Sequence, residues 1–226
     1  MIKLLNISKI YNPDINALRG VNLHIKPGEF VSIVGQSGSG KTTMVKALIG
    51  EEQVDQGKIL VGGWDITNIG QREIPFLRRQ IGVIFQDFKL LDKKDLLENV
   101  AFALQVCGQT PKKINTIVPQ VMKIVGLEEM QERYPHEVSG GEQQRAAIAR
   151  ALVHRPKILL ADEPTGNLDS INANEIIDLL LRINKLGTTV VLVTHNREVV
   201  NKLRKRVITI DSGQIVSDQE KGKYIL

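Results

Sequence analysis

Short runs of apolar residues recur along the chain, at residues 31–34, 82–85, 158–161 and 189–193. Each run is rich in apolar, often β-branched side chains and does not alternate with polar residues. Runs of this kind are typical of strands buried on both faces, as in a parallel sheet covered by helices. We therefore predict that these segments form the strands of such a sheet.

Helical patterns lie between these strands. The clearest one spans residues 173–186, and its apolar face is formed by Ile176, Ile177, Leu179, Leu180 and Ile183. An apolar stripe at this spacing is typical of a helix that packs on a core. Because strands and helices alternate, the pattern predicts an α/β fold.

Two regions depart from this alternation. Residues 1–30 resemble short alternating strands separated by turn signals at Asn12-Pro13-Asp14 and Pro27-Gly28-Glu29, which predicts an antiparallel β edge. Residues from about 88 to 150 are mostly helical in pattern, with helices expected at 96–106 and 113–125. We predict one domain, residues 1–226, with a parallel-sheet core, that β edge and an inserted helical subdomain.

Composition narrows the class of protein. The chain has 226 residues, of which 42% are hydrophobic and 24% charged, as expected for a globular domain. Its longest apolar runs are far shorter than the roughly 20 residues that cross a bilayer, and its start lacks the pattern of a secretory signal. A single cysteine, Cys107, allows neither an internal disulfide nor a cysteine metal cluster. These features favour the cytoplasm.

The net charge of +5 and the basic pI near 9.3 leave two interpretations open. A basic balance can indicate binding to nucleic acid or to an anionic membrane surface. Charges of both signs are interspersed along most of the chain, which favours an ordinary solvated surface. The exception is the basic run at residues 202–206, which could face a membrane or simply solvate the end of a helix.

A glycine-rich loop follows the strand at residues 30–34 and leads into a helix expected at residues 43–49. The loop consists of Gly35, Gln36, Ser37, Gly38, Ser39, Gly40, Lys41 and Thr42, and Thr43 begins the helix. This G-x-x-x-x-G-K-[ST] pattern forms a nest of backbone N–H groups around phosphate oxygens, which the helix N-terminus reinforces. Lys41 is expected on the β- and γ-phosphates and the Thr42 hydroxyl on Mg²⁺. A glycine-rich turn without a ligand is the less favoured alternative.

An acidic pair, Asp162 and Glu163, ends the apolar strand at residues 158–161. Ligands of open α/β sheets collect at the carboxyl ends of the strands. Asp162 can therefore hold Mg²⁺ opposite Thr42, and Glu163 can act as the general base for an attacking water. Alone, such a pair is as well explained by a turn at a strand end. The phosphate loop upstream favours the functional interpretation.

A third segment, residues 138–145, precedes a helix that is expected to end near His154. Ser139 and Glu142 match a capping box, which by itself explains their presence. Gly140 and Gly141 are not explained by capping. They expose backbone N–H groups at a helix N-terminus and predict a second site for an anion.

This segment resembles the signature of the ATP-binding cassette (ABC) family, usually Leu-Ser-Gly-Gly-Gln, with Val138 and Glu142 as departures. The remaining family elements occur in order over essentially the whole chain. They are the phosphate loop at 35–42, a Q-loop glutamine, the Walker B acids, a D-loop aspartate, a switch histidine and an aromatic residue that stacks on adenine: Gln86, Asp162, Glu163, Asp169, His195 and Tyr11. Taken singly, Tyr11, Gln86 and His195 would be ordinary core, surface and strand-end residues.

The resemblance implies that two copies dock head to tail and enclose two ATP molecules. The phosphate loop of one copy and Ser139, Gly140 and Gly141 of the other would then hold the same γ-phosphate. ATP and Mg²⁺ are the implied cofactors. The residues expected to act in catalysis are Glu163, His195, Gln86 and Lys41, and those expected around Mg²⁺ are Thr42, Gln86 and Asp162.

The run at residues 162–169 resembles the ABC branch of lipoprotein-release, macrolide-efflux and cell-division ATPases. Four stretches, 11–21, 85–91, 194–200 and 220–224, resemble the FtsE family of cell-division ATPases most. This implies a homodimer at the cytoplasmic face of the membrane, driving an FtsX-like integral membrane partner that regulates cell-wall hydrolysis. The alternative is the ATPase of an exporter or of a lipoprotein- or lipid-extraction complex. A P-loop enzyme acting on nucleic acid is disfavoured, and no nucleic-acid partner is expected.

Overall fold

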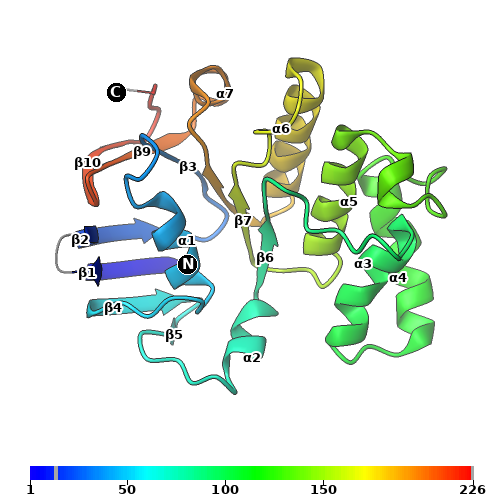
Figure 1. The fold of residues 1–226 in the computed structure, drawn as a ribbon, viewed down its shortest axis with the longest axis horizontal. Coiled ribbons are helices and arrows are strands. Elements are labelled where there is room, and N and C mark those ends of the chain that lie inside the picture. Colours follow the sequence, from blue (N-terminus) through cyan, green and yellow to red (C-terminus); the bar gives the residue numbers. More distant parts are fainter. Residues whose placement is uncertain (13–14, 225–226) are drawn as a thin grey trace.

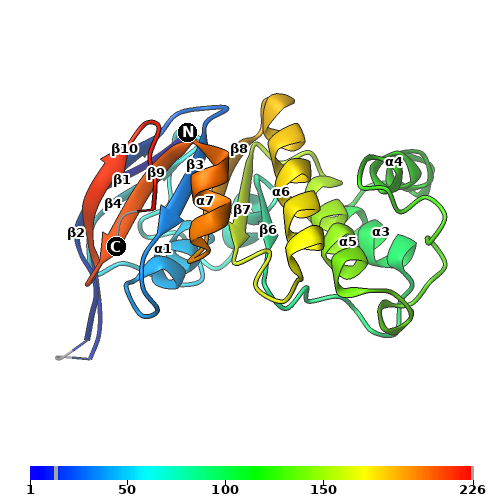
Figure 2. The same cartoon turned by 90° about the horizontal axis from the view of Figure 1, so that it is seen from above.

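The computed structural model describes residues 1–12 and 15–224, so the first predicted turn, at Pro13 and Asp14, lies outside the described residues. A six-stranded sheet with the order β10-β9-β3-β8-β7-β6 forms the centre of the molecule (Figures 1 and 2). Its strands are β3 (Phe30–Val34), β6 (Ile81–Ile84), β7 (Ile158–Asp162), β8 (Thr189–Val193), β9 (Arg206–Asp211) and β10 (Gln214–Gln219). All are parallel to their neighbours except β10, which pairs antiparallel with β9. The predicted α/β fold is confirmed.

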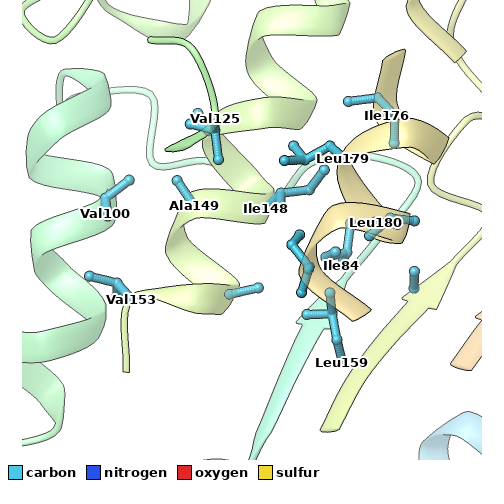
Figure 3. Close-up of a cluster of buried hydrophobic side chains, with 14 of the residues drawn as sticks. Ile84, Val100, Val125, Ile148, Ala149, Val153, Leu159, Ile176, Leu179 and Leu180 are labelled. Atoms are coloured by element: carbon cyan, nitrogen blue, oxygen red, sulfur yellow. The ribbon is translucent and has the colours of Figure 1, made fainter. Parts of the chain in front are cut away.

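The central strands are apolar at consecutive positions because both of their faces are covered. In β7, Leu159 and Ala161 join a core shared with the helices, whereas Ile158 and Leu160 join a core on the opposite face. Figure 3 shows the first of these cores, in which Leu159 lies next to Ile84 and below Leu180 of the helix α6 (Ser170–Lys185). Successive strand side chains point to opposite faces of a sheet. Two-sided burial therefore accounts for the apolar runs in the sequence.

A second, antiparallel sheet has the order β2-β1-β4-β5. It contains β1 (Ile2–Asn12) and β2 (Ile15–Ile25) from the predicted edge, together with β4 (Gln56–Val61) and β5 (Trp64–Asp65) from beyond the phosphate loop. The strands β4 and β5 were not predicted, because β4 depends on pairing with the distant strand β1 and the two-residue strand β5 pairs only with β4. At Gly57, with φ +89°, a side chain would collide with the backbone of β1, so glycine permits the close approach.

Helices cover the central sheet and extend from one end of it (Figure 2). They are α1 (Lys41–Leu48), α2 (Ile74–Arg78), α3 (Leu96–Val106), α4 (Pro111–Ile124), the 3₁₀ helix η1 (Pro135–Glu137), α5 (Gly140–Leu152), α6 (Ser170–Lys185) and α7 (Arg197–Leu203). Helices α3, α4 and α5 are inserted between β6 and β7 and lie beyond α6, at the far end from the antiparallel sheet. We propose that residues 88–150 act as a separate signalling subdomain.

The inserted region begins with a loop, since α3 starts only at Leu96. This loop is held by Asn99, whose side chain is 0% exposed. Its Oδ1 accepts from the Leu91 amide at 2.7 Å, and its Nδ2 donates to the carbonyls of Leu91 and Lys94 at 3.1 and 2.9 Å. A buried amide satisfied in this way fixes the path of the loop that follows β6.

Candidate active site at the carboxyl edge of the sheet

A cavity of about 720 Å³ lies at the carboxyl edge of the central sheet. The predicted site residues among those that line it are Tyr11, Gln36, Ser37, Gly38, Gly40, Lys41, Thr42, Thr43, Gln86, Asp162, Glu163 and His195. They come from the phosphate loop and α1, the end of β1, and the loops after β6, β7 and β8. The parallel arrangement thus gathers residues that are far apart in the sequence.

The phosphate loop is held in shape by close backbone contacts. Gly40 has φ +106°, and a Cβ there would collide with the carbonyl oxygen of Ala17. Gly35 lies against the Ile210 carbonyl and the adjacent Ser39 is buried, so both support the loop from behind without lining the cavity. Among the described residues, no side chain caps the N-terminus of α1. Its first amides are therefore available to an anion.

Lys41 is the cation of this loop. It is 8% exposed, and its Nζ donates to the carbonyls of Gly35 and Gln36 at 2.8 and 2.7 Å. Burial lowers the pKa of Lys41, and the nearby carboxylates of Glu163 and Asp162 oppose that effect. A charged, partly desolvated amine beside an amide-lined loop can bind a polyphosphate strongly.

The acidic pair lies across the cavity from the loop. Burial of Asp162 at the end of β7 raises the pKa of its carboxyl, the neighbouring charge of Glu163 raises it further, and Lys41 lowers it. A bound cation would offset the cost of burying this carboxylate. Asp162 is therefore suited to a position beside a metal ion.

Glu163 adopts a left-handed backbone conformation, with φ +48°. Its amide donates to the Val193 carbonyl at 2.9 Å, which ties it to the end of β8. Its Oε1 lies 2.7 Å from Nδ1 of His195, so a proton on Nδ1 would be donated to this carboxylate. Positive φ at a residue other than glycine is uncommon and concentrates at functional sites. The geometry brings the expected base and the expected switch histidine into direct contact.

Gln86 contacts a residue that sequence reasoning did not single out. Its Nε2 lies 3.2 Å from Oδ1 of Asn167, and Asn167 Nδ2 donates to the Gln86 carbonyl at 3.0 Å. The amide oxygen Oε1 of Gln86 is the side-chain atom that could bind a cation. Asn167 lies within the 162–169 run that carried the family resemblance, which was the available signal for it.

Tyr11, 43% exposed, lines the cavity from the hairpin of β1 and β2. Lys9 Nζ lies 5.5 Å from the centroid of its ring. An exposed aromatic face at the cavity rim is consistent with stacking on a base. Three neighbouring residues of β2 and one from the end of the chain also line the cavity and were not predicted: Ile15, Asn16, Ala17 and Tyr224.

The predicted signature and D-loop residues do not line this cavity. Ser139 caps α5, with Gly140 and Gly141 in the first turn, and Asp169 caps α6. Asp169 accepts from the amides of Ile171 and Asn172 at 2.9 and 3.0 Å, and hydrogen bonds from Asn172 lower the pKa of Asp169. Within one described chain, these residues complete helices instead of touching the phosphate loop.

The fold and the cavity together define a P-loop ATPase with the layout of an ABC cassette. A family model for the ABC transporter family matches residues 18–166. The cell-division ATP-binding proteins FtsE of Streptococcus pneumoniae strain D39 and of Bacillus subtilis are each 48% identical to the chain over 224 residues. Those matches cover 99% of this chain and 97% and 98% of the relatives.

Among solved structures, a dimeric post-hydrolysis state of the ATP-binding cassette MJ0796, bound to ADP and phosphate, has a TM-score of 0.88. It is 35% identical and covers 99% of this chain and 100% of its own. The chain therefore belongs to the ABC transporter family of ATP-binding proteins, in the FtsE family of cell-division ATPases. The predicted family and ABC-type ATPase activity are confirmed. In the described part of the chain, no helix combines the length and apolarity needed to cross a bilayer.

Proposed function

We infer that two copies of this chain close head to tail around two ATP molecules and transmit that closure to an FtsX-like membrane protein. The observation that carries this proposal is the separation between the cavity and the signature. Ser139, Gly140 and Gly141 are absent from the cavity lining among the described residues, although they stand at a helix N-terminus. A second copy could supply them, and the MJ0796 cassette, which has a similar fold, is dimeric in its post-hydrolysis state.

Mg²⁺ would be held by Thr42, Gln86 and Asp162, all of which line the cavity. A hydroxyl, an amide oxygen and a carboxylate are the oxygen ligands that Mg²⁺ prefers. Burial of this carboxylate raises the pKa of Asp162, which supports a position beside a bound cation. When bound, the ion would neutralise charge on the phosphates.

Hydrolysis would follow from the contact between Glu163 and His195. Glu163 takes a proton from a water whose oxygen bonds to the γ-phosphorus. The bond from that phosphorus to its bridging oxygen breaks, and ADP leaves. His195, held 2.7 Å from Glu163, would position the base and would contact the γ-phosphate from the same side of the cavity lining. Loss of the shared phosphate removes the anion that joins the two copies, so the dimer opens.

The membrane partner would bind a groove of about 650 Å³ between α2 and α3. Its lining is apolar and basic, and is formed by Ile74, Pro75, Arg78, Arg79, Lys89, Leu91, Phe102, Ala103, Val106, Cys107, Arg150 and His154. Phe102 and Val106 are 39% and 60% exposed. An exposed apolar patch rimmed by charge is typical of a protein interface. By analogy with other ABC cassettes, the segment from Asp87 to Asn99 after Gln86 is expected to contact the partner. Lys89 and Leu91 of this segment line the groove, but Asn99 is buried and cannot touch a partner.

Arg150 connects this groove to the ATP site. It belongs to α5, the helix that Ser139 caps, and its guanidinium donates to the carbonyls of Phe88 and Lys89 at 2.8 and 2.5 Å. Phe88 and Lys89 follow Gln86 and both have positive φ. A displacement of α5 on dimer closure would therefore move the loop that lines the groove.

The proposed location is the cytoplasmic face of the membrane, beneath that partner. No nucleic-acid partner is proposed. The basic run at residues 202–206 is partly neutralised, since Arg206 lies 3.0 Å from Glu29 and 2.7 Å from Asp218.

Recovery of the partner from membranes tests this function. The tagged chain should co-purify with an FtsX-like membrane protein, and Val106→Glu should reduce its recovery by about tenfold or more, because a charge would be buried in the groove. Val216→Glu is the matched control, since Val216 is 57% exposed on β10, outside the groove. Recovery of a transporter with a substrate cavity would instead support the exporter alternative, and full recovery with Val106→Glu would place the docking surface elsewhere.

A further inference from the structure

The end of the chain folds back onto the central sheet. After β10, the Gly222 amide donates to the Lys205 carbonyl at 3.1 Å, and Gly222 is buried against β9. A Cβ at this position would lie 2.7 Å from Cβ of Val207. Only glycine allows the backbone to approach β9 so closely. The tail, defined here as residues 220–224, therefore has a specific docking position.

Tyr224 anchors this tail on α7. Its amide donates to Oδ1 of Asn201 at 2.9 Å, and its ring lies 5.0 Å from Cζ of Arg197. The same ring packs against a small buried cluster of Val34, Val200 and Val207. Aromatic packing and a cation–π contact each stabilise such an arrangement.

Tyr224 also lines the ATP cavity, as Tyr11 does. Tyr11 reaches the cavity from the end of β1, whereas Tyr224 reaches it from the tail beside α7. Tyr11 belongs to the hairpin whose core includes Leu18 and Ile33, whereas Tyr224 packs with Val34 and Val200 on the side of α7. Val34 is the last residue before the phosphate loop, so the Tyr224 ring packs close to the start of that loop.

The helix α7 begins two residues after His195, which itself follows the end of β8. It has 7 residues and is capped by Asn196, which accepts from the Val199 amide at 3.1 Å. So short a helix owes its position to tertiary contacts. The tail supplies contacts on α7 at Arg197, Val200 and Asn201, close to the residue that contacts Glu163.

We propose that the C-terminal tail is part of the ATP site, with Tyr224 as a nucleotide-binding residue that closes the cavity on the α7 side. This inference rests on the assignment of the cavity to ATP. Because two groups that stabilise one another do so reciprocally, ATP must also hold the tail in place. The tail would then dock more firmly when nucleotide is bound.

Equilibrium titration of the full-length chain with ATP and Mg²⁺ tests the binding role. Tyr224→Ala should weaken ATP affinity by about tenfold, the usual scale for a lost aromatic contact. Tyr224→Phe should stay within about twofold of the parent chain, because the ring makes the contacts. Tyr134→Ala is the matched control, since Tyr134 is 40% exposed and lies in the inserted region, outside the cavity lining.

Hydrogen exchange in the unaltered chain tests the reciprocal effect without relying on a variant. ATP should slow exchange at the amides of Gly222 and Tyr224, whose partners are Lys205 and Asn201, and leave the Gly108 amide unchanged. Unchanged affinity with Tyr224→Ala, or unchanged exchange at both tail amides, would overturn the proposal. Failure of the proposed dimer and membrane coupling would leave both measurements intact, since each reports ATP binding to one chain.

Discussion

The N-termini of α1 and α5 both have glycines at or next to their first residue and both are expected to meet phosphate, but they differ in how their amides are satisfied. At α1, Gly40 has a left-handed backbone and no side chain of the described residues caps the helix. At α5, the Ser139 side chain accepts from the Glu142 amide, and Glu142 accepts in turn from the Ser139 amide at 2.7 Å. The hydrogen bond from Ser139 also lowers the pKa of Glu142.

The difference separates a site that is complete in one chain from one that requires a partner. The phosphate loop is shaped by contacts that do not depend on a ligand, so it is pre-organised to bind ATP. The N-terminus of α5 is capped within the single chain, and the Ser139 hydroxyl already donates a hydrogen bond to Glu142. It can therefore be stable in a single chain and still exchange that hydrogen bond for a phosphate oxygen.

The largest effect should come from Glu163→Gln, which removes the base but keeps the shape of the side chain. We expect ATP turnover to fall by about 100-fold or more, the scale of general-base catalysis. ATP binding should persist, so α1 of one copy and α5 of the other should stay joined through the γ-phosphate. A dimer should therefore accumulate, as measured by size-exclusion chromatography. Glu129→Gln, an exposed residue of the inserted region, is the control. Persistent turnover would remove Glu163 from the role of base.

The next largest effect is the loss of ATP affinity when the phosphate loop at the N-terminus of α1 is altered. Lys41→Ala should weaken ATP binding by about 100-fold, because a charge-assisted contact to phosphate is lost. Titration calorimetry would measure the change. Lys46→Ala in the same helix should bind ATP normally, since Lys46 lies outside the cavity lining and pairs with Glu51 at 3.5 Å. Equal affinity in both variants would contradict the assignment of the phosphate loop.

A smaller effect isolates the α5 terminus. Ser139→Ala and Asp95→Ala each remove one member of a capping box, since Asp95 and Glu98 cap α3 in the same way. Both should lower the free energy of unfolding by about 1 kcal/mol, measured by urea denaturation. Only Ser139→Ala should also lower ATP turnover, by about tenfold, because only Ser139 is expected on the partner's phosphate. Equal turnover in the two variants would reduce Ser139 to a helix cap.

Local patterns in the sequence predicted much of the fold. The apolar runs corresponded to β3, β6, β7 and β8, and the helix expected at residues 96–106 is α3. These elements were accessible because two-sided burial and helical periodicity leave a pattern within one segment. The strands β4 and β5 left no such pattern, since β4 pairs with β1 over a long range and β5 is only two residues long and pairs with β4.

Spacing in the sequence also singled out the phosphate loop, Asp162 and Glu163, and the family resemblance added His195; the structure brings Lys41, Asp162, Glu163 and His195 together around the cavity. Sequence reasoning did not identify Asn167 or Tyr224. Asn167 matters because it bonds Gln86, which is 81 residues away, and Tyr224 because the tail crosses β9. Contacts of this kind join residues that are far apart in the sequence, so a pattern within one segment does not predict them.

The sequence by itself determined the chemistry of this protein: a phosphate loop, an acidic pair and a self-capped glycine segment, each defined by residues within a few positions of one another. Tertiary structure decided what those pieces could do together. It placed Glu163 on His195, joined α5 to the Gln86 loop through Arg150, and kept Ser139 away from the cavity. The physical reason is that backbone conformation and capping are local, whereas distances between side chains follow from the packing of the whole sheet and its helices.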